Sequence, residues 1–450
     1  MMTKRGPGSD DSRRRGHSRF RWTEFQLLVP PVLLLAVGLL TVVLVPRGSA
    51  DFTWRDLWLA LAFGALVGGI SLGFSAAGFR GDQLLLPLVA ALAGLGLLAI
   101  ERLAPALERL HPGYGRLAAR QVAYLAVGLV VLWYTAVHFR HLHLLRRYKY
   151  TLAVAGVALM LATLLFGREI NGARLWLRAG PIDIETAELL KLVLVCFLAG
   201  YLDDKRELLA APYRLGPLPL PPVPYLLPMV LLWGAALLIV VAQQALGMAF
   251  LYFGIFLALL YVASGKLLYV LAGLGALGGG VALADHLFAR VGQRVAIWLD
   301  PWPQGLGAGY QIIQGQYALA SGGLFGTGLG SGSPTLIPEV QTDFVFAALG
   351  EELGLLGTLA VLALYLLLAY RGLHIALRAA DGFARLVAVG LATILGLQAL
   401  IIMGGVVRLI PLTGVPLPFI SYGGSSLLTN CFLVGLLLNI SDPRRGALPA

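Results

Sequence analysis

Long apolar runs, separated by short polar segments, follow one another along almost the whole chain. Twelve of these runs are close to membrane-spanning length, and within each run the apolar residues are continuous rather than placed at every second position. A helix needs about 20 apolar residues to cross a bilayer, and inside hydrocarbon only a helix or a closed barrel satisfies its backbone polar groups. The pattern predicts an all-α polytopic integral membrane protein, because the strands of a barrel would alternate apolar and polar residues.

The predicted spans cover residues 25–46, 56–79, 84–103, 119–138, 148–166, 186–202, 223–243, 245–264, 267–290, 343–370, 384–407 and 420–439. The longest interruption is the Gly-rich loop 291–342, which precedes the tenth span. Residues 1–24 form a basic tail that we expect to be disordered. A second short tail, 441–450, ends the chain.

The composition agrees with a protein whose solvent is the bilayer. Hydrophobic residues make up 58% of the chain and charged residues 13%, at a mean hydropathy of +0.81, whereas a soluble domain carries about 25% charged residues. The net charge of +11 raises the question of a nucleic-acid partner. Since Lys and Arg gather in short loops and in the first tail, membrane topology explains them, and we expect no nucleic acid to bind.

The basic loops predict the orientation. With an even number of spans, the first tail, the segment RHLHLLRRYKY (140–150) and the C-terminal end fall on one side, which the positive-inside rule makes cytoplasmic. The loops 104–118, 167–185, 291–342 and 408–419 then face outward. Both cysteines lie in apolar runs and behave as small hydrophobic residues. The scattered His residues form no metal-ligand cluster, so no metal site is predicted.

Asp343 stands where the polar loop ends and an apolar helix resumes. As the residue after Thr342 it suits a helix N-cap. The functional alternative is a general base at the membrane surface, where partial burial raises a carboxyl pKa toward neutrality. Glu351 and Glu352 lie about 12–14 Å deeper along the helix, too far to share a hydrolytic site with Asp343. We expect these two side chains to pair with Arg or polar groups inside the bundle.

Two further outward segments carry candidate ligand-binding residues. In 168–192, Glu188 and Lys191 share a helix face at i and i+3; they form either a packing ion pair or, together with Arg174, part of a site for an anion such as a pyrophosphate. In 408–428, the helix-opening groups of a Ser- and Gly-rich turn suit an anion, with small residues for close packing as the alternative. The candidate residues of this turn are Arg408, Ser421, Gly423 and Ser425.

At these segments the chain resembles the SEDS family (shape, elongation, division and sporulation), the RodA/FtsW/SpoVE polytopic proteins. The resemblance covers about 85–445. The motifs that carry it are NGARLWL (171–177), AELLKL (187–192), DPWPQGLGAGYQIIQGQYALASGGLFGTGLG (300–330), IPEVQTDFVFAALGEELG (337–354) and PLTGVPLPFISYGGSSLL (411–428). Since family members have about ten spans, the resemblance implies a ten-helix core at 84–440 and two additional N-terminal helices at 25–83.

The resemblance also implies an activity. Such a protein is a peptidoglycan glycosyltransferase that polymerises lipid II, for cell division or elongation, at the outer face of the bacterial cytoplasmic membrane. Asp343 matches the family's essential carboxylate, and the partner is a class B penicillin-binding protein. The resemblance leaves open whether a divalent cation, Mg or Mn, assists; no bound cofactor is evident. A lipid II flippase and a non-catalytic scaffold of a cell-wall complex stay open as alternatives. The family's Asp before Leu-Gly is absent here, where Ala245 stands.

Overall fold

The computed structural model describes residues 20–47, 57–110, 112–139, 141–170, 173–179, 182–207, 214–215, 218–219 and 223–444. Most of the first tail and residues 445–450 of the second lie outside these ranges, so the predicted disorder of the first is untested. The start of the first helix is described: it begins at Trp22, three residues before the predicted start. Arg21 and Glu24, which were assigned to the tail, are buried.

All twelve predicted spans are helices. They are α1 (Trp22–Arg47), α2 (Trp58–Ala76), α3 (Leu85–Leu110), α4 (Leu117–His138), α6 (Lys149–Phe166), α7 (Thr186–Asp204), α9 (Val223–Ala242), α10 (Leu246–Ser264), α11 (Leu267–Leu287), α14 (Val345–Arg378), α15 (Gly382–Val406) and α16 (Gly424–Ser441). Among the described residues, 10 helices are long and apolar enough to cross a membrane. The other two of this set are α7, which carries charged residues near both ends, and α9, whose described apolar part is shorter.

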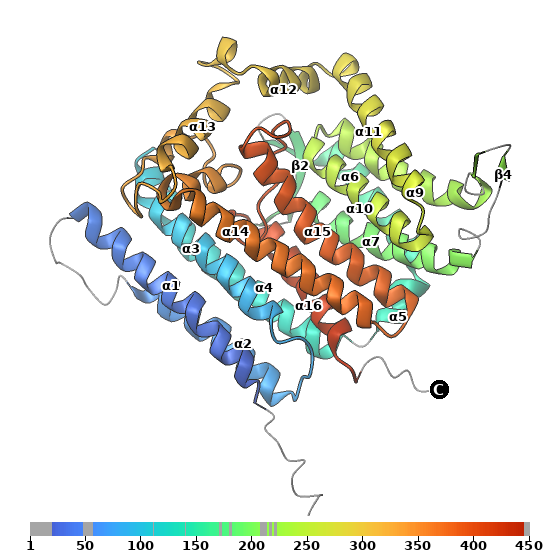
Figure 1. The fold of residues 1–450 in the computed structure, drawn as a ribbon, viewed down its shortest axis with the longest axis horizontal. Helices are drawn as coiled ribbons and strands as arrows, with labels where there is room; N and C mark the ends of the chain where they lie inside the picture. The colour runs from blue at the N-terminus through green and yellow to red at the C-terminus, as the bar shows by residue number, and fades with distance from the viewer. Residues whose placement is uncertain are drawn as a thin grey trace, which may run out of the picture.

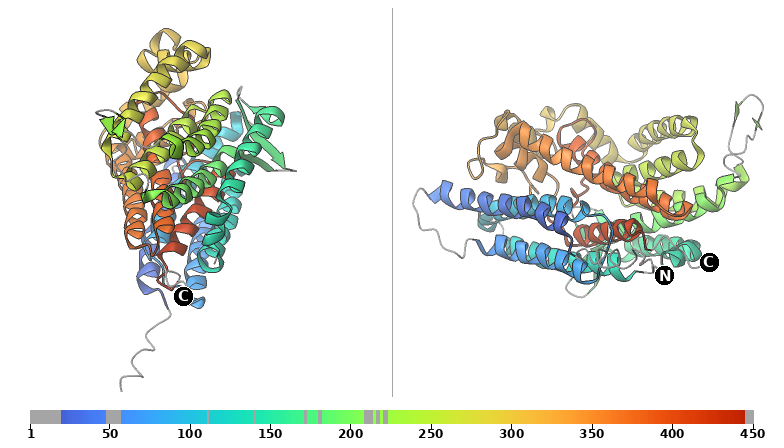
Figure 2. Two further views of the ribbon diagram at one scale, coloured as in Figure 1. Left: turned by 90° about the vertical axis from the view of Figure 1, so that its right-hand side faces the viewer. Right: turned by 60° about the horizontal axis from the view of Figure 1, so that its bottom comes forward.

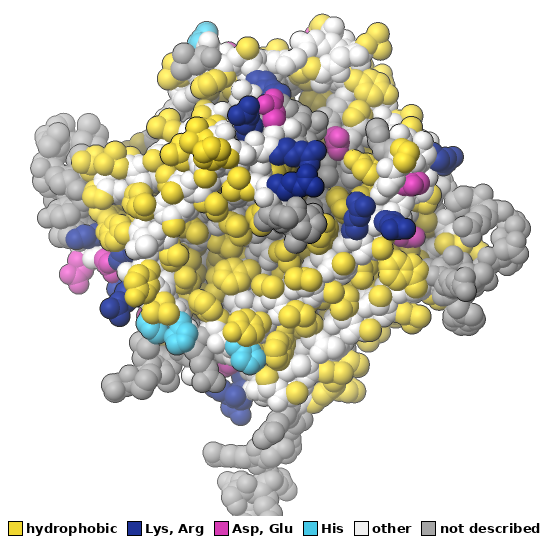
Figure 3. All heavy atoms as spheres, turned by 180° about the vertical axis from the view of Figure 1, so that it is seen from behind, with side chains coloured by type: hydrophobic (Ala, Val, Ile, Leu, Met, Phe, Trp, Pro, Cys, Tyr) yellow, Lys and Arg dark blue, Asp and Glu magenta, His cyan; other side chains and the backbone are white. Residues whose placement is uncertain are grey.

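The long helices pack side by side in one tilted bundle (Figure 1). Helix α4 packs against α16, α14 against α15, and α1 against α3. Small residues allow such close crossings: a Cβ added to Gly372 on α14 would lie 2.7 Å from the Cβ of Ala392 on α15. On the face seen from behind, hydrophobic side chains form a broad band with most Lys, Arg and His side chains on either side of it (Figure 3). This is the surface of a multi-pass membrane protein.

The start of α1 and the end of α16 lie at the same end of the bundle. Arg21 donates to the backbone carbonyl of Asp82, and the backbone N–H of Asp82 donates to Ser441. The short helix α5 (Leu142–Arg147) packs beside α7 at this end. The other end carries Asp343, and we call it the Asp343 end.

The Asp343 end contains structure that the hydrophobic pattern did not predict. Residues 168–185 form a three-stranded antiparallel sheet, and the interruption before α14 contains helices that lie across the end of the bundle (Figures 1 and 2). The strands are β1 (Arg168–Ile170), β2 (Ala173–Ala179) and β3 (Ile182–Glu185), and the helices are α12 (Ala289–Leu299) and α13 (Tyr310–Gly322). The remaining short elements are η2 (Tyr114–Arg116), η3 (Trp302–Gln304), η4 (Pro334–Leu336), β4 (Arg214–Leu215) and β5 (Leu218–Pro219).

Candidate functional site

Asp343 is not the N-cap of the helix that follows it. Helix α14 begins at Val345, its N-cap position is Phe344, and no side chain caps it. The backbone N–H of Asp343 donates to the carbonyl of Glu339 at 3.1 Å, which closes a turn before the helix. The structural alternative for Asp343 is therefore wrong, and its carboxylate is available for another role.

The segment around Ser421 holds Asp343 in place. The Ser421 hydroxyl donates to the carbonyl of Thr342 at 2.5 Å and accepts from the N–H of Leu417. The N–H of Tyr422 donates to the carbonyl of Gln341 at 2.9 Å. Gly414 lies so close that a Cβ added to it would stand 3.5 Å from Oδ2 of Asp343. The buried hydroxyl of Ser421 thus positions the carboxylate, and its predicted contact with substrate stays a prediction.

Ser425, in the segment 408–428, joins that segment to the outward segment 168–192. Its hydroxyl donates to the carbonyl of Asp183 at 3.2 Å and accepts from the N–H of Glu185, also at 3.2 Å. Both partners belong to β3, and Ser425 lies in the first turn of α16. Gly423 is the N-cap of α16 and offers no side chain to that turn. The three segments singled out in the sequence therefore meet at one end of the bundle.

The electrostatic surroundings of Asp343 suit a proton acceptor. Burial raises its pKa from 3.8 to about 6, a hydrogen bond from Thr342 and the charge of Arg294 lower it, and the charge of Glu339 raises it. A carboxyl with this pKa is mostly ionised at neutral pH and is more basic than an exposed aspartate. A general base is most effective when its pKa lies near the working pH.

Two arginines of α12 were missed in the sequence analysis. Nη1 of Arg294 is buried and has no hydrogen-bond partner among the described residues. Burial and the charge of Arg290 lower the Arg294 pKa, whereas the charge of Asp343 raises it. Arg290, one helical turn earlier, donates to Gln244 at 2.9 Å. The i, i+4 spacing of the two arginines on an amphipathic helix was the signal in the sequence.

Glu185 is a second missed residue. It ends β3 at the N-cap of α7 and is half-buried. Burial raises its pKa to about 8; the charges of Glu188 and Asp343 also raise it, and that of Lys191 lowers it. At neutral pH this carboxyl is therefore mostly protonated. Its position beside the motif that contains Glu188 and Lys191 could have drawn attention to it.

Glu188 and Lys191 form a closed buried network. Both side chains are fully buried, and Nζ of Lys191 donates to Glu188 at 2.5 Å, to Gln398 at 2.9 Å and to Asn430 at 3.2 Å. An ammonium has three donors, so all of them are used. The geometry matches the packing alternative that the sequence analysis left open. A contact with substrate would require one of these partners to be exchanged.

The guanidinium groups of Arg408 and Arg174 are engaged with other parts of the protein. Arg408 donates to the carbonyls of Trp298 and Leu299 at 3.0 Å, which are the last residues of α12. A cation at a helix C-terminus is stabilised by the helix dipole, so Arg408 anchors α12. Arg174 is exposed on β2 and pairs with Glu169 at 3.3 Å. The predicted substrate contacts of both arginines stay predictions.

The glycines of the polar loop allow close packing of backbone. Residues 323–333 of this loop are bonded to the first half of α14. The N–H of Thr327 donates to the carbonyl of Glu351 at 2.9 Å, and that of Leu355 donates to Gly323 at 2.9 Å. A Cβ on Gly326, whose φ is 84°, would overlap the carbonyl of Glu352. Backbone bonds of this kind hold the loop to a transmembrane helix.

The expected pairing of Glu351 and Glu352 inside the bundle is confirmed. Arg102 of α3 donates to Glu352 at 2.9 Å and to the carbonyls of Gly330 and Gly332. Glu351 accepts from the N–H of Ser333 at 2.7 Å. The two carboxylates therefore fix the loop and do not join Asp343.

The described residues contain no group of three or more His, Cys, Asp or Glu side chains that could hold a metal ion. The divalent cation named in the sequence analysis stays a prediction, and the chemistry below uses only side chains and backbone.

The comparisons with known proteins agree with this geometry. A family model of the FtsW/RodA/SpoVE cell cycle proteins matches residues 83–446. The chain is 38% identical over 404 residues to "Peptidoglycan glycosyltransferase RodA" of Mycobacterium bovis, a match that covers 88% of this chain and 85% of that protein. Because 88% of this chain is longer than 83–446, the match reaches into the N-terminal helices.

Solved structures show the same fold. A chain of "Structural coordination of polymerization and crosslinking by a peptidoglycan synthase complex" is 30% identical with a TM-score of 0.65, covering 80% of this chain and 98% of that one. The Thermus thermophilus rod shape determining protein RodA is 29% identical with a TM-score of 0.57, covering 80% and 97%. The chain belongs to the FtsW/RodA/SpoVE family of cell cycle proteins, the SEDS family of the sequence resemblance.

Proposed function

We propose that this chain is a peptidoglycan glycosyltransferase that polymerises lipid II into glycan strands. The observation that carries the proposal is the position of Asp343, a half-buried carboxylate where the three outward segments meet, with a pKa raised to about 6 by burial. Relatives named for this activity cover most of the chain. The site lies at one end of a membrane-spanning bundle, where a lipid-linked sugar presents its headgroup.

In the proposed reaction the 4-hydroxyl of one lipid II attacks the anomeric carbon of the growing strand. A C–O bond forms there while the bond to the lipid pyrophosphate breaks, and the pyrophosphate leaves with the electron pair. Asp343 accepts the hydroxyl proton. Positioned proton transfer contributes about 10²–10⁴-fold to such a rate, so Asp343 supplies a large share of the acceleration without forming a covalent intermediate.

The leaving group carries negative charge that the site must stabilise. Arg294 is suited to this role because its buried Nη1 has no partner among the described residues, and a guanidinium binds phosphate oxygens in a fork. Arg290 lies one turn away on the same helix. The N–H groups of the first turn of α16, after Gly423, add donors at a helix N-terminus.

The cellular setting follows from the same proposal. Positive loops favour cytoplasmic termini, so Asp343 faces the outside of the bacterial cytoplasmic membrane. A class B penicillin-binding protein is the proposed partner, since a structural neighbour belongs to a peptidoglycan synthase complex. The ion pair of Glu352 with Arg102 favours a polymerase over a flippase, because this carboxylate is not free to line a path through the bilayer.

The proposal is tested by glycan-strand formation from lipid II, using the purified chain with its transpeptidase partner. We expect Asp343→Ala to lower the rate by about 10²–10⁴-fold. Asp300→Ala is the matched control, because Asp300 is an exposed aspartate in the same part of the chain. Unchanged polymerisation by Asp343→Ala would remove Asp343 as the base. No polymer from the wild type would favour the flippase or scaffold.

A further inference from the structure

A pocket of about 1110 Å³ lies at the end of the bundle opposite to Asp343. It is lined by the last turns of α14, whereas Asp343 precedes the first turn of the same helix. The 34 residues of α14 span about 50 Å at 1.5 Å per residue. The α2–α3 connection at 77–83 and the end of α16 supply other walls. The pocket is thus separate from the proposed catalytic site.

The pocket is rich in arginine. Five guanidinium groups line it, those of Arg80, Arg146, Arg371, Arg378 and Arg444. Two of them are neutralised inside the protein. Arg146 pairs with Asp203 at 3.0 Å and with Asp204 at 2.9 Å, and Arg371 pairs with Asp82.

The three carboxylates of the pocket have backbone partners. Asp82 accepts from the N–H groups of Leu84 and Leu85, besides pairing with Arg371. Asp381 accepts from Ala384 at the start of α15, and Asp442 accepts from the N–H of Arg444. These carboxylates cap turns and helices at fixed positions.

The other three guanidinium groups of the pocket have no such carboxylate partner in the described part of the chain. The side chains of Arg80, Arg378 and Arg444 are exposed, and no side-chain hydrogen bond or ion pair joins them to another described residue. They reach one pocket from three different segments. Backbone N–H donors leave Asp381 and Asp442 negatively charged, so the three arginines exceed these two aspartates by one positive charge, and guanidinium groups without a carboxylate partner suit a phosphate group.

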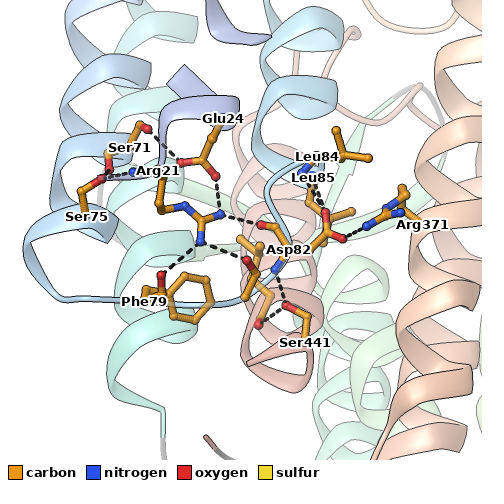
Figure 4. Close-up of polar contacts among 12 residues, drawn as sticks. Arg21, Glu24, Ser71, Ser75, Phe79, Asp82, Leu84, Leu85, Arg371 and Ser441 are labelled. Carbon is orange, nitrogen blue, oxygen red and sulfur yellow. Dashed lines mark hydrogen bonds and ion pairs between the residues drawn. The ribbon is translucent and has the colours of Figure 1, made fainter. Parts of the chain in front are cut away.

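The N-terminal helices hold one wall of this pocket in shape (Figure 4). Arg21 donates to the carbonyls of Phe79, Gly81 and Asp82 at 3.3, 3.0 and 2.6 Å, so its guanidinium fixes the loop that contains Arg80. Glu24 accepts from Arg21 at 2.6 Å and from Ser71 at 2.8 Å. A buried ion pair with further hydrogen bonds specifies one arrangement more than it adds stability. The helices before residue 83 thereby preorganise an arginine-bearing wall.

The surroundings of the pocket point to a lipid as the occupant. On the same turns of α14, but on another face of the helix, Leu373 and Leu377 do not line the pocket and are 44% and 78% exposed. Basic pockets between transmembrane helices bind anionic lipid headgroups, and this pocket lies on a helix whose neighbouring face is exposed and apolar.

We propose that the pocket binds the phosphate of an anionic phospholipid from the leaflet at this end of the bundle. Arg80, Arg378 and Arg444 contact the headgroup, and the acyl chains lie along the exposed apolar face of α14. In the orientation proposed above this is the cytoplasmic leaflet. The binding itself does not depend on the polymerase activity.

The test is lipid retention by the purified full chain in nanodiscs made from phosphatidylglycerol and phosphatidylcholine. The variant removes three pocket arginines by Arg80→Gln, Arg378→Gln and Arg444→Gln. The control removes three basic side chains at the same end that do not line the pocket, by Arg147→Gln, Lys205→Gln and Arg206→Gln. We expect wild type and control to retain phosphatidylglycerol at least threefold over phosphatidylcholine after delipidation, and the pocket variant to lose this preference.

Equal losses in the pocket variant and the control would overturn the proposal, because the effect would then be one of net charge. Retention of the preference by the pocket variant would overturn it as well. A third arm adds inorganic phosphate to the delipidated protein. If phosphate at millimolar concentration raises the Tm of the wild type as much as phosphatidylglycerol does, the occupant is a soluble anion and the lipid assignment fails.

Discussion

Two clusters of charged residues at the Asp343 half of the molecule differ in how completely their hydrogen-bonding groups are used. Around Lys191 every ammonium proton has a partner, and Gln398, which accepts one of them, also donates to the carbonyl of Pro416 at 2.9 Å. Around Asp343 a carboxylate and the guanidinium of Arg294 affect one another's pKa values, yet Nη1 of Arg294 has no partner among the described residues.

The difference separates a packing role from a chemical one. A network of buried charges whose hydrogen-bonding groups are all used fixes how α7, α15 and α16 pack. Removal of one charged partner leaves the other charge buried without compensation. An open site retains donors and acceptors for a ligand. Charge inside a membrane protein is a weak guide to function by itself; unused hydrogen-bonding capacity is a better one.

The largest effect on stability is expected at the closed cluster. Lys191→Met leaves Glu188 buried without a cation, which costs about 3–5 kcal/mol of unfolding free energy. The double variant Glu188→Gln with Lys191→Met removes both charges and recovers much of this loss. Unfolding in detergent micelles measures both. A single variant as stable as the double one would show that the network does not hold the helices together.

At Asp343 we expect removal of the charge to change the free energy of unfolding in the opposite direction. Burial raises the pKa of Asp343 from 3.8 to about 6, so ionisation above pH 6 costs folding free energy that the unfolded chain does not lose. We therefore expect Asp343→Asn to keep or slightly raise the unfolding free energy at pH 7. A clear loss of stability would place Asp343 among the structural charges.

Arg102 is a partnered cation with an intermediate effect. It bonds Glu352 and two loop carbonyls and is 18% exposed. Arg102→Gln is expected to cost about 1–3 kcal/mol, because it leaves Glu352 unpaired. Arg109→Gln on the exposed face of the same helix is the control. Amide hydrogen exchange at 327–333 should become faster in Arg102→Gln only. Equal exchange rates in the two variants would show that Arg102 does not hold the loop in place.

At Arg294 the expected effect falls on substrate binding rather than on the free energy of unfolding. Arg294→Gln should raise the KM for lipid II about tenfold, which corresponds to about 1.4 kcal/mol, with little change in unfolding. Steady-state polymerisation kinetics measure this, and Gln293→Ala on the exposed face of α12 is the control. A KM equal to that of the wild type would remove Arg294 from the phosphate-binding groups.

The sequence predicted the spans well because each depends on a local property, a run of apolar residues. It also singled out the three outward segments, which the structure brings together, and Asp343, whose role as a base stays a prediction. It did not predict the sheet at 168–185 or α12 and α13, whose residues lack long apolar runs. Nor could it decide between the two roles of Lys191, because the partners Gln398 and Asn430 lie more than 200 positions away along the chain. Whether every donor of a buried charged group has a partner depends on the tertiary structure.

The measurement that tests the central claim most directly is the pH dependence of glycan-strand formation by the wild type and by Asp343→Asn. Because the base must be ionised, the wild-type rate should fall about tenfold per pH unit below a pKa of about 6. The Asn variant should retain only a small rate without this inflection. A wild-type rate that stays flat from pH 7 to pH 5, or an Asn variant that polymerises as fast as the wild type, would contradict the assignment of Asp343 as the general base.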